Sequence, residues 1–173
     1  VTDEENFLRI KEAYNKGIEV ILKTQTTVNG KRTVWCAQHD ENTLLPAPAR
    51  SYELPSFSGA ESVGIIKLLM DIPDPSPEII EAIKGSVEWF DNHRIKNARW
   101  DVFVNKDGKR DRRIVYDPNA GDLWARFYDL ETGNPFFCDR DGIKKNTLAE
   151  IGYNRRTDYV WYVNSPDKLL RRY

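Results

Sequence analysis

Arginines are the residues of this sequence best suited to chemistry on an anionic ligand, and Arg50 stands out among them. It lies in a stretch, residues 35–58, that contains Pro46, Pro48 and Pro55 and follows neither a strand period nor a helix period. Irregular segments longer than about 12–15 residues are uncommon in compact domains and are usually functional or disordered. This one is well supplied with aromatic and aliphatic residues, which disordered segments lack. We therefore expect an ordered surface loop that displays Arg50.

A second arginine, Arg126, is predicted to lie between two aromatic rings. The alternation of side chains around it indicates a strand that carries Trp124, Arg126 and Tyr128 on one face. A guanidinium binds a carboxylate through two parallel hydrogen bonds, and aromatic rings cover the faces of sugars. This face therefore suits a carboxylated sugar. The pattern leaves open a surface arginine that pairs with Asp129 or Glu131, an interaction of roughly 0–1 kcal/mol.

Arg140 is the third candidate, and it lies in the string CDRDG between Asp139 and Asp141. Such a string also fits a solvated turn with no ligand. The two aspartates are conceivable metal ligands, but they lack the spacing of the D-x-D-x-D-G loop that EF-hand calcium sites use. The motif alone therefore predicts no particular metal site.

His39 precedes Asp40 and Glu41 in the proline-rich loop, which gives a histidine next to acids. No G-x-S-x-G or H-E-x-x-H motif accompanies it, and two histidines in the whole sequence exclude a multi-histidine metal site. Carboxylate pairs of glycoside hydrolases are recognised by a separation of about 5–9.5 Å in space, and nothing in the sequence singles out such a pair. We keep His39 as a candidate for ligand binding.

Length and composition limit the classes of partner. The 173 residues fit one domain, and 26 basic against 27 acidic residues give a net charge of −1. No basic run predicts nucleic-acid binding, and no apolar run is long enough to span a membrane. Two cysteines, Cys36 and Cys138, allow one disulfide, although two buried free thiols are the favoured interpretation.

The chain must position these side chains with helices in its first half. Apolar residues recur at helical spacing from Thr2 to about Thr24, with Thr2 and Glu5 as a capping box. A second, largely apolar helix is predicted from Ser58 or Gly59 to about Asp71. A serine cap and a proline at the first helical position start a third at 76–77, which continues to about residue 93.

The second half has a different character, with short elements. The remaining predictions are a hairpin of residues 100–104 and 113–116 around Lys106-Asp107-Gly108, a short helix at 147–151 capped by Asn146, a strand at 157–163, and a terminal helix from Ser165-Pro166. The expected fold is therefore mainly α, with short irregular β-strands and long loops.

Two long strings resemble a known family. WCAQHDENTLLPAPARSYELPSFSGAESVGI is similar to one signature of the family 10 polysaccharide lyases, and RFYDLETGNPFFCDRDGIKKNTLAEIGYNRRTDYVWY is similar to a second. The resemblance implies a pectate lyase, which cleaves polygalacturonate by β-elimination and leaves 4,5-unsaturated oligogalacturonides. It also implies that these residues form part of an (α/α) toroid-like helical domain, and that the protein is secreted, from a bacterium.

The resemblance assigns roles to the candidate residues. Arg50 corresponds to the family's catalytic base, and Arg126 and Arg140 to arginines that bind uronates. Calcium and arginines would neutralise the uronate carboxylate, which acidifies the C5 proton. Because the pKa of arginine exceeds about 12, we expect a cationic neighbourhood to favour its neutral form, and an alkaline optimum. The expected substrate-binding set consists of Arg126, Arg140, Trp124, Tyr128 and His39; the metal ligands are not identified.

One departure from the family concerns the start of the chain. The family's catalytic domain is longer, and its acidic calcium motif precedes the WCAQHDE string, where this sequence has no matching aspartates. We therefore expect residues 1–173 to be a catalytic region incomplete at the N-terminus, completed by a further segment or a separate chain. The alternatives are a non-catalytic module that binds polygalacturonate or pectin oligosaccharides, and an inverting hydrolase on a helical toroid.

Overall fold

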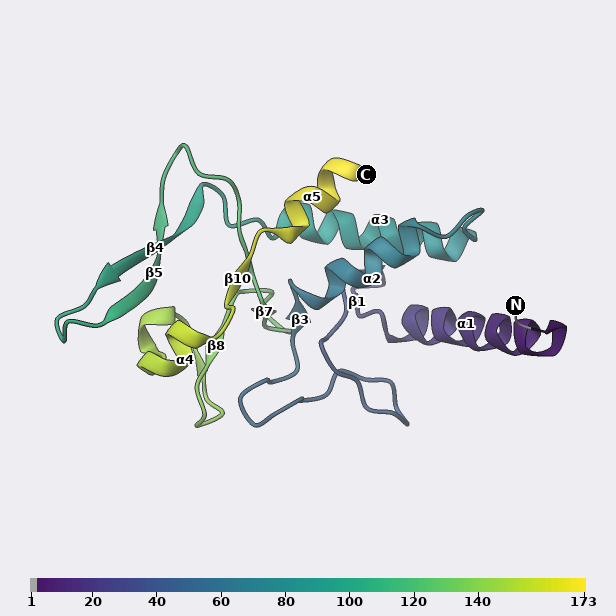
Figure 1. The fold of residues 1–173 in the computed structure, drawn as a ribbon, viewed down its shortest axis with the longest axis horizontal. Coiled ribbons are helices and arrows are strands. Elements are labelled where there is room, and N and C mark those ends of the chain that lie inside the picture. Colours follow the sequence, from purple (N-terminus) through teal and green to yellow (C-terminus); the bar gives the residue numbers. More distant parts are fainter. Residues whose placement is uncertain (1–2) are drawn as a thin grey trace.

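The computed structural model describes residues 3–173 and shows an elongated molecule with two unlike ends (Figure 1). Helices α1 (Glu4–Thr24), α2 (Glu61–Met70), α3 (Pro77–Asn92) and α5 (Ser165–Arg172) lie at one end. The hairpin of β4 (Ala98–Val104) and β5 (Arg110–Tyr116) and the short helix α4 (Tyr153–Asp158) lie at the other. Between them run loops and strands of two residues each.

Local signals set the starts of the first helices. Ser76 caps α3 by accepting a hydrogen bond from the Ile79 amide at 3.3 Å, and Pro77 occupies the first turn, so that prediction is confirmed. Asp3 caps α1 and accepts from the Asn6 amide at 2.8 Å. The predicted cap Thr2 lies outside the described residues.

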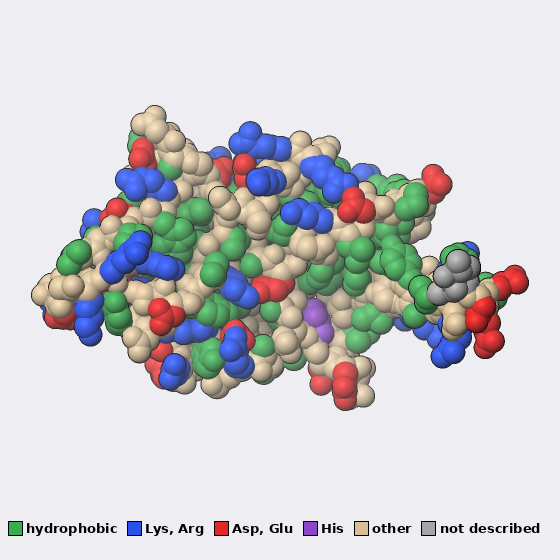
Figure 2. All heavy atoms as spheres, in the orientation of Figure 1, with side chains coloured by type: hydrophobic (Ala, Val, Ile, Leu, Met, Phe, Trp, Pro, Cys, Tyr) green, Lys and Arg blue, Asp and Glu red, His purple; other side chains and the backbone are tan. Residues whose placement is uncertain are grey.

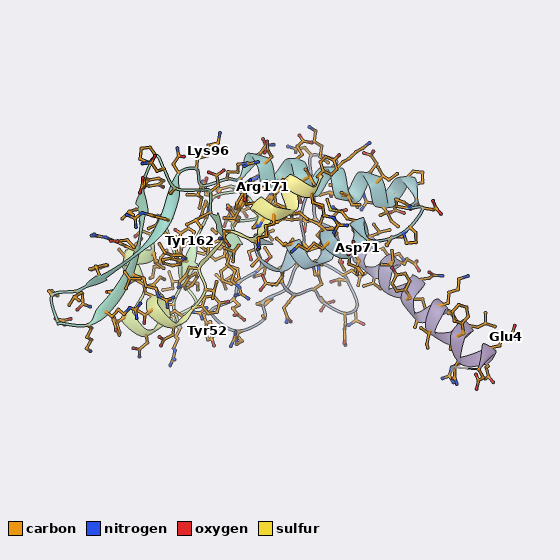
Figure 3. The ribbon with its side chains drawn as sticks, turned by 45° about the horizontal axis from the view of Figure 1, so that its top comes forward. Glu4, Tyr52, Asp71, Lys96, Tyr162 and Arg171 are labelled. Atoms are coloured by element: carbon orange, nitrogen blue, oxygen red, sulfur yellow. The ribbon has the colours of Figure 1, made fainter. Side chains whose placement is uncertain are left out.

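Helix α1 has an apolar face that is used unevenly. Ile18, Ile21 and Leu22, near its end, pack against the main hydrophobic cluster. Phe7 and Ile10, near its start, are 58% and 59% exposed, and no residue of the helix is fully buried. The first turns of α1 therefore project from the body of the molecule, as Figure 3 shows near Glu4.

The helical end has a polar centre as well as an apolar core. The Gln25 side-chain amide lies within hydrogen-bond distance of the Thr33 carbonyl, the Ala82 carbonyl and the Ser86 hydroxyl, at 2.8, 2.9 and 3.1 Å. These atoms belong to the end of α1, the chain after β2 (Lys31–Arg32), and α3. One amide thus fixes three segments to one another, since each buried acceptor would lose a partner if they separated.

The strands of residues 3–173 form five antiparallel pairs and no larger sheet. The Asn29-Gly30 turn, with φ of 51° and 76°, joins β1 to β2, and the predicted long hairpin is confirmed. The pairs are β1 (Thr27–Val28) with β2, β3 (Phe57–Ser58) with β7 (Phe127–Tyr128), β4 with β5, β6 (Trp124–Ala125) with β10 (Tyr162–Val163), and β8 (Phe137–Cys138) with β9 (Lys144–Lys145).

The prediction of part of an (α/α) toroid is wrong. The structure is 37% helix and 20% strand, and residues 3–173 form five α-helices and small sheets. After Asn92 the chain forms strands, turns and only short helices, because its aromatic residues pack on one another in a second cluster, which includes Phe127, Phe137 and Trp161. A ring of paired helices requires helical periodicity throughout, and this half does not have it.

Three predictions of single elements in the second half of the chain also need correction. The strand expected around Arg126 is divided into β6 and β7 with Arg126 between them. Of the strand expected at 157–163, residues 157–158 belong to α4, residues 159–161 are irregular, and a strand is present at Tyr162–Val163, as β10. The predicted helix at 147–151 is a short 3₁₀-helix, Leu148–Glu150, and Thr147 rather than Asn146 caps it.

Two further expectations concern the cysteines and membranes. Cys36 and Cys138 are both buried and free, as the sequence favoured. Within residues 3–173, the helices are too short or too polar to cross a membrane.

A buried ion pair fastens the hairpin to α4. Asp111 of β5 is 3% exposed and receives hydrogen bonds from Nε and Nη2 of Arg156 at 2.8 and 2.7 Å. The Arg112 amide and the Asn105 side chain also donate to this carboxylate. The Arg156 guanidinium therefore holds the pKa of Asp111 well below its ordinary value of 3.8.

We expect Asp111→Ala to lower the free energy of unfolding by about 3 kcal/mol, because it leaves the Arg156 charge largely buried without its partner. The pKa of the Asp111 carboxyl is lowered in the folded protein. The ion pair therefore stabilises the fold above pH 3.8, and this stabilisation is lost as the pH falls below that value. Denaturant unfolding at neutral pH and at about pH 3 measures both effects. The exposed Asp107→Ala is the control; equal losses for the two variants would contradict the role of the pair.

Candidate active site

Trp35 anchors both ends of the loop that carries Arg50. Its backbone amide donates to Ser62 Oγ at 3.0 Å, its carbonyl oxygen accepts from the Ser58 amide at 2.8 Å, and its indole Nε1 donates to the Ile21 carbonyl at 2.7 Å. The ring is 1% exposed. Residues 36–56 therefore leave and return to one rigid point between α1 and α2.

The returning end of the loop also positions Arg126. The Gly59 amide donates to the Arg126 carbonyl at 3.0 Å, and β3 pairs with β7 beside it. A Cβ atom on Gly59 would collide with the Ala125 carbonyl oxygen, so this approach requires glycine. Two segments far apart in the sequence thereby come together.

A pocket of about 210 Å³ lies where these segments meet, and we call it the Arg50 pocket. The charged and polar side chains that line it include Arg50, Glu53, Glu61, Arg126 and Tyr159. Two arginines singled out from the sequence thus share one cavity. Arg50 comes from the loop, Arg126 from the connection between β6 and β7, and Tyr159 from the residue after α4.

Within the pocket Arg50 is held by a carboxylate of its own loop. Its Nε and Nη2 donate to the two oxygens of Glu53 at 2.8 and 2.6 Å. The arginine side chain is 58% exposed and that of Glu53 only 11%. The pair raises the pKa of Arg50 above its ordinary value and lowers the pKa of Glu53. Arg50 is therefore firmly protonated in this state.

Tyr159 completes this network. Its hydroxyl donates to Glu53 Oε1 at 2.7 Å, and burial together with that carboxylate raises the pKa of Tyr159 to about 12. This tyrosine was not among the site residues predicted from the sequence. Only its place in the aromatic string DYVWY pointed to Tyr159 in the sequence, because its hydrogen-bond partner Glu53 lies far away along the chain.

Arg126 forms a second ion pair, with Glu61 at the start of α2. Glu61 also accepts a hydrogen bond from Ser58. The guanidinium carbon lies 4.9 Å from the centre of the Tyr159 ring, and Nε is buried without a hydrogen-bond partner. The carboxylates suggested by the sequence, Asp129 and Glu131, are not its partner. Part of the Arg126 fork therefore remains unused.

Arg155 of α4 is a third cation beside this pocket, and it was not predicted from the sequence as a site residue. Its guanidinium carbon lies 3.6 Å from the centre of the Tyr159 ring and 4.3 Å from that of Tyr52. Figure 3 labels Tyr52, which belongs to the Arg50 loop, at the lower edge of the molecule. Nη2 of Arg155 is buried without a partner, and the charge contributes to the lowered pKa of Glu53. The string NRRTDYVWY contained this residue but gave no reason to prefer it over Arg156.

Arg140 and His39 lie outside the Arg50 pocket. Arg140 is in the turn after β8 and lines a separate pocket with Lys109 and Tyr153. The His39 Nδ1 lies 3.0 Å from the Leu44 carbonyl, within a turn of the loop, and its Nε2 is buried without a partner. Their predicted roles in substrate binding stay predictions.

Trp124 and Tyr128 are core residues in this structure, 0% and 1% exposed. The Trp124 indole donates to the Phe90 carbonyl at 2.7 Å, and the Tyr128 hydroxyl donates to the His93 carbonyl at 2.9 Å. The prediction that these rings flank Arg126 on an exposed face is wrong, because a buried ring cannot cover a sugar. Arg126 lies in the break between β6 and β7, and the Tyr159 ring, rather than that of Trp124 or Tyr128, lies next to its guanidinium.

Comparison with known proteins agrees with the two sequence signatures. The family model described as pectic acid lyase matches residues 1–170. The chain belongs to the pectic acid lyase family.

Solved structures give the same result for this pectic acid lyase chain. A family 10 polysaccharide lyase from Cellvibrio cellulosa, and an aspartate-to-alanine mutant of it in complex with trigalacturonic acid, each match with a TM-score of 0.87 and 36% identity. Both matches cover 99% of this chain and 52% of the other. The chain thus spans about half the length of these relatives. A comparison with curated proteins gives no match.

The described part of this chain does not provide a calcium site by itself. Within residues 3–173, no three His, Cys, Asp or Glu side chains lie close enough together to hold a metal ion. The two carboxylates of the Arg50 pocket, Glu53 and Glu61, are each paired with an arginine. These residues therefore do not fit a bound calcium ion, which prefers six to eight oxygen ligands.

We expect Trp124→Phe to lower the free energy of unfolding by about 2 kcal/mol, because the buried Phe90 carbonyl loses its donor. The affinity for trigalacturonate should stay that of the unsubstituted chain, since the ring lies in the core. Denaturant unfolding and calorimetric titration measure the two quantities. A selective loss of affinity at unchanged stability would show instead that Trp124 contacts the ligand.

Proposed function

We propose that this chain forms the part of a pectate lyase that binds polygalacturonate and cleaves it by β-elimination to 4,5-unsaturated oligogalacturonides. The observation that carries the proposal is the Arg50 pocket, in which Arg50 and Arg126, from distant parts of the sequence, line one cavity. Membership of the pectic acid lyase family and the trigalacturonate complex of the relative support it.

Arg126 is suited to hold the uronate carboxylate next to the reacting carbon. Its Nε has no protein partner, although Nη2 is paired with Glu61. A carboxylate that accepts hydrogen bonds from this fork loses part of its negative charge. The C5 proton of the same sugar becomes more acidic, because the charge that develops on its removal is stabilised in place.

Arg50 is the proposed base, and Glu53 has to release it first. While the pair persists, the pKa of Arg50 is raised and the guanidinium has no lone pair to accept a proton. Without Glu53, the positive charges of Arg126 and Arg155 would favour neutral Arg50 by like-charge repulsion. Neutral Arg50 takes the C5 proton, the C5–H electrons form the C4–C5 double bond, and the C4–O bond breaks with its electrons on the glycosidic oxygen. We infer an alkaline optimum from this requirement.

Calcium remains part of the proposal for the whole enzyme only. The resemblance to family 10 lyases implies it, but residues 3–173 offer no ligand set for it. We assign no residue of this chain to the ion and no step of the reaction to it.

Binding without catalysis is the second candidate function. It is favoured by the absence of a calcium ligand set among residues 3–173. The deciding experiment is to follow ultraviolet absorbance on polygalacturonate, first with calcium and then with excess chelator. Growth that requires calcium supports the lyase. A folded chain that binds the polymer but gives no growth, alone or with the remaining part of the enzyme, supports binding only.

In the preparation that shows turnover, we expect Arg50→Ala to lower kcat by about 100-fold or more, as loss of a general base does. The fold should persist because the side chain is 58% exposed. Arg113→Ala is a matched control, because the Arg113 side chain is 59% exposed and also forms a salt bridge, with Asp101. Turnover of Arg50→Ala at the level of the Arg113 variant would remove Arg50 from the mechanism.

Arg126→Ala is expected to weaken polygalacturonate binding about tenfold at low salt, because a charge-assisted contact to a uronate is lost. The difference from the unsubstituted chain should shrink as salt rises and screens the remaining charges. Titrations over a salt series measure this, and Arg126→Lys should retain part of the affinity. Equal affinities of Arg126→Ala and the unsubstituted chain at every salt concentration would refute the assignment.

A further inference from the structure

Glu53 connects the proposed base to a phenol through one of its oxygen atoms. Its Oε1 accepts from Arg50 Nη2 at 2.6 Å and from the Tyr159 hydroxyl at 2.7 Å, while Oε2 accepts from Arg50 Nε at 2.8 Å. We propose that Tyr159 is a positioning residue for the elimination, whose hydroxyl holds Glu53 when this carboxylate leaves Arg50. The inference rests on the proposed function, in which Arg50 is the base.

Glu53 needs a second partner because it is largely buried. In Figure 2 many basic side chains lie beside acidic ones at the surface, where water can replace a lost partner. Only 11% of the Glu53 side chain is exposed, so water can replace little of what Arg50 provides. A buried carboxylate without a partner carries a large desolvation cost. Glu53 can therefore leave Arg50 only if other donors already surround it.

Tyr159 supplies the first of these donors and keeps it at alkaline pH. Burial of the ring and the hydrogen bond to Glu53 raise the pKa of Tyr159 to about 12. The hydroxyl therefore stays protonated over the alkaline range in which we expect the elimination. A phenolate would have no proton to donate and would repel the carboxylate.

Arg155 supplies the positive charge that the displaced carboxylate requires. Its guanidinium carbon lies 3.6 Å from the centre of the Tyr159 ring, and its Nη2 is buried without a partner. Among residues 3–173, the ion pairs of the neighbouring arginines Arg50, Arg126 and Arg156 do not involve it. The charge of Arg155 already contributes to the lowered pKa of Glu53, so the two groups interact in this state. Tyr159 and Arg155 thus offer Glu53 a hydrogen bond together with a cation.

A uronate in the Arg50 pocket would displace Glu53 towards this site. A uronate carboxylate at Arg126 brings a second negative charge into the pocket that Glu53 lines, and the two repel each other. Arg155 is not part of the lining of that pocket, so a shift towards it leads away from the entering charge. The pKa of Arg50 then falls from its raised value, and more of the arginine is free to accept the C5 proton.

The other groups around Arg50 and Glu53 do not provide the same site. Glu61 lines the pocket but is paired with Arg126, and it is an anion like Glu53. The Tyr52 ring lies 5.1 Å from the Arg50 guanidinium carbon. The titratable and charged groups around the pair are Tyr52 of the same loop, Glu61 of α2, Arg126, Tyr159 and Arg155.

The test is the Tyr159→Phe variant, which removes the hydroxyl and keeps the ring beside Arg126 and Arg155. In the preparation that shows turnover on polygalacturonate, we expect the rise of kcat with pH to move up by about one pH unit, because Glu53 then stays on Arg50. On the rising limb kcat is then about tenfold lower, and KM stays that of the unsubstituted enzyme. Glu53→Gln should move the rise to lower pH, since the charge that stabilises protonated Arg50 is gone.

A double variant shows whether the hydroxyl acts through the carboxylate. In the Glu53→Gln background, Tyr159→Phe should cause no further shift of the pH profile. Tyr116→Phe is the matched control, because it removes a hydroxyl from a residue that is 76% exposed, at the end of β5 and outside the Arg50 pocket. Its pH profile should be that of the unsubstituted enzyme.

Three outcomes would overturn this inference alone. An unshifted profile for Tyr159→Phe with unchanged kcat would show that the hydroxyl has no part in the release of Arg50. An equal loss of kcat at every pH would show a structural role only, and equal shifts with and without Glu53 would show that the hydroxyl acts on Arg50 directly. Absence of turnover in the unsubstituted enzyme, with calcium and with its remaining part present, would instead overturn the proposed catalysis and this inference with it.

Discussion

The structure depends on the anchoring of the Arg50 loop at Trp35. Through one buried residue, the loop is tied to the end of α1, to the start of α2 and to its own returning end at Ser58. The returning end then binds Arg126 through Gly59. A long irregular segment is entropically costly to order, and these few hydrogen bonds at a dry point fix its position. The geometry of the Arg50 pocket follows from them.

The two arginines of that pocket are each held by a carboxylate, but they differ in which of their hydrogen-bond donors have no partner. Arg50 donates to both oxygens of a largely buried carboxylate, Glu53, whereas Arg126 pairs with Glu61 and keeps an unpartnered Nε. The Arg50 pocket thus contains one arginine with a buried donor that has no partner and another whose fork a carboxylate already occupies. The same carboxylate that orders Arg50 also opposes its loss of a proton.

Local signals in the sequence predicted much of the fold. Serine and proline at 76–77 and the glycine turn at Gly108 act within a few residues, so α3 and the hairpin could be read directly. The toroid, and the exposed rings at Trp124 and Tyr128, could not be judged in this way, because burial depends on which distant segments pack together. The same holds for the site: Arg126 could be named, but its partner Glu61 and its neighbour Tyr159 are remote in the sequence.

The uneven packing of α1 has a consequence for local unfolding. Its last turns are held by Ile18, Ile21 and the Trp35 indole, whereas its first turns have Phe7 and Ile10 exposed. Short helical segments without tertiary packing are marginal in water. We therefore expect α1 to open from Glu4 towards Thr24. Protection of its backbone amides against hydrogen exchange should rise along the helix, from the projecting end to the end beside the loop that carries Arg50.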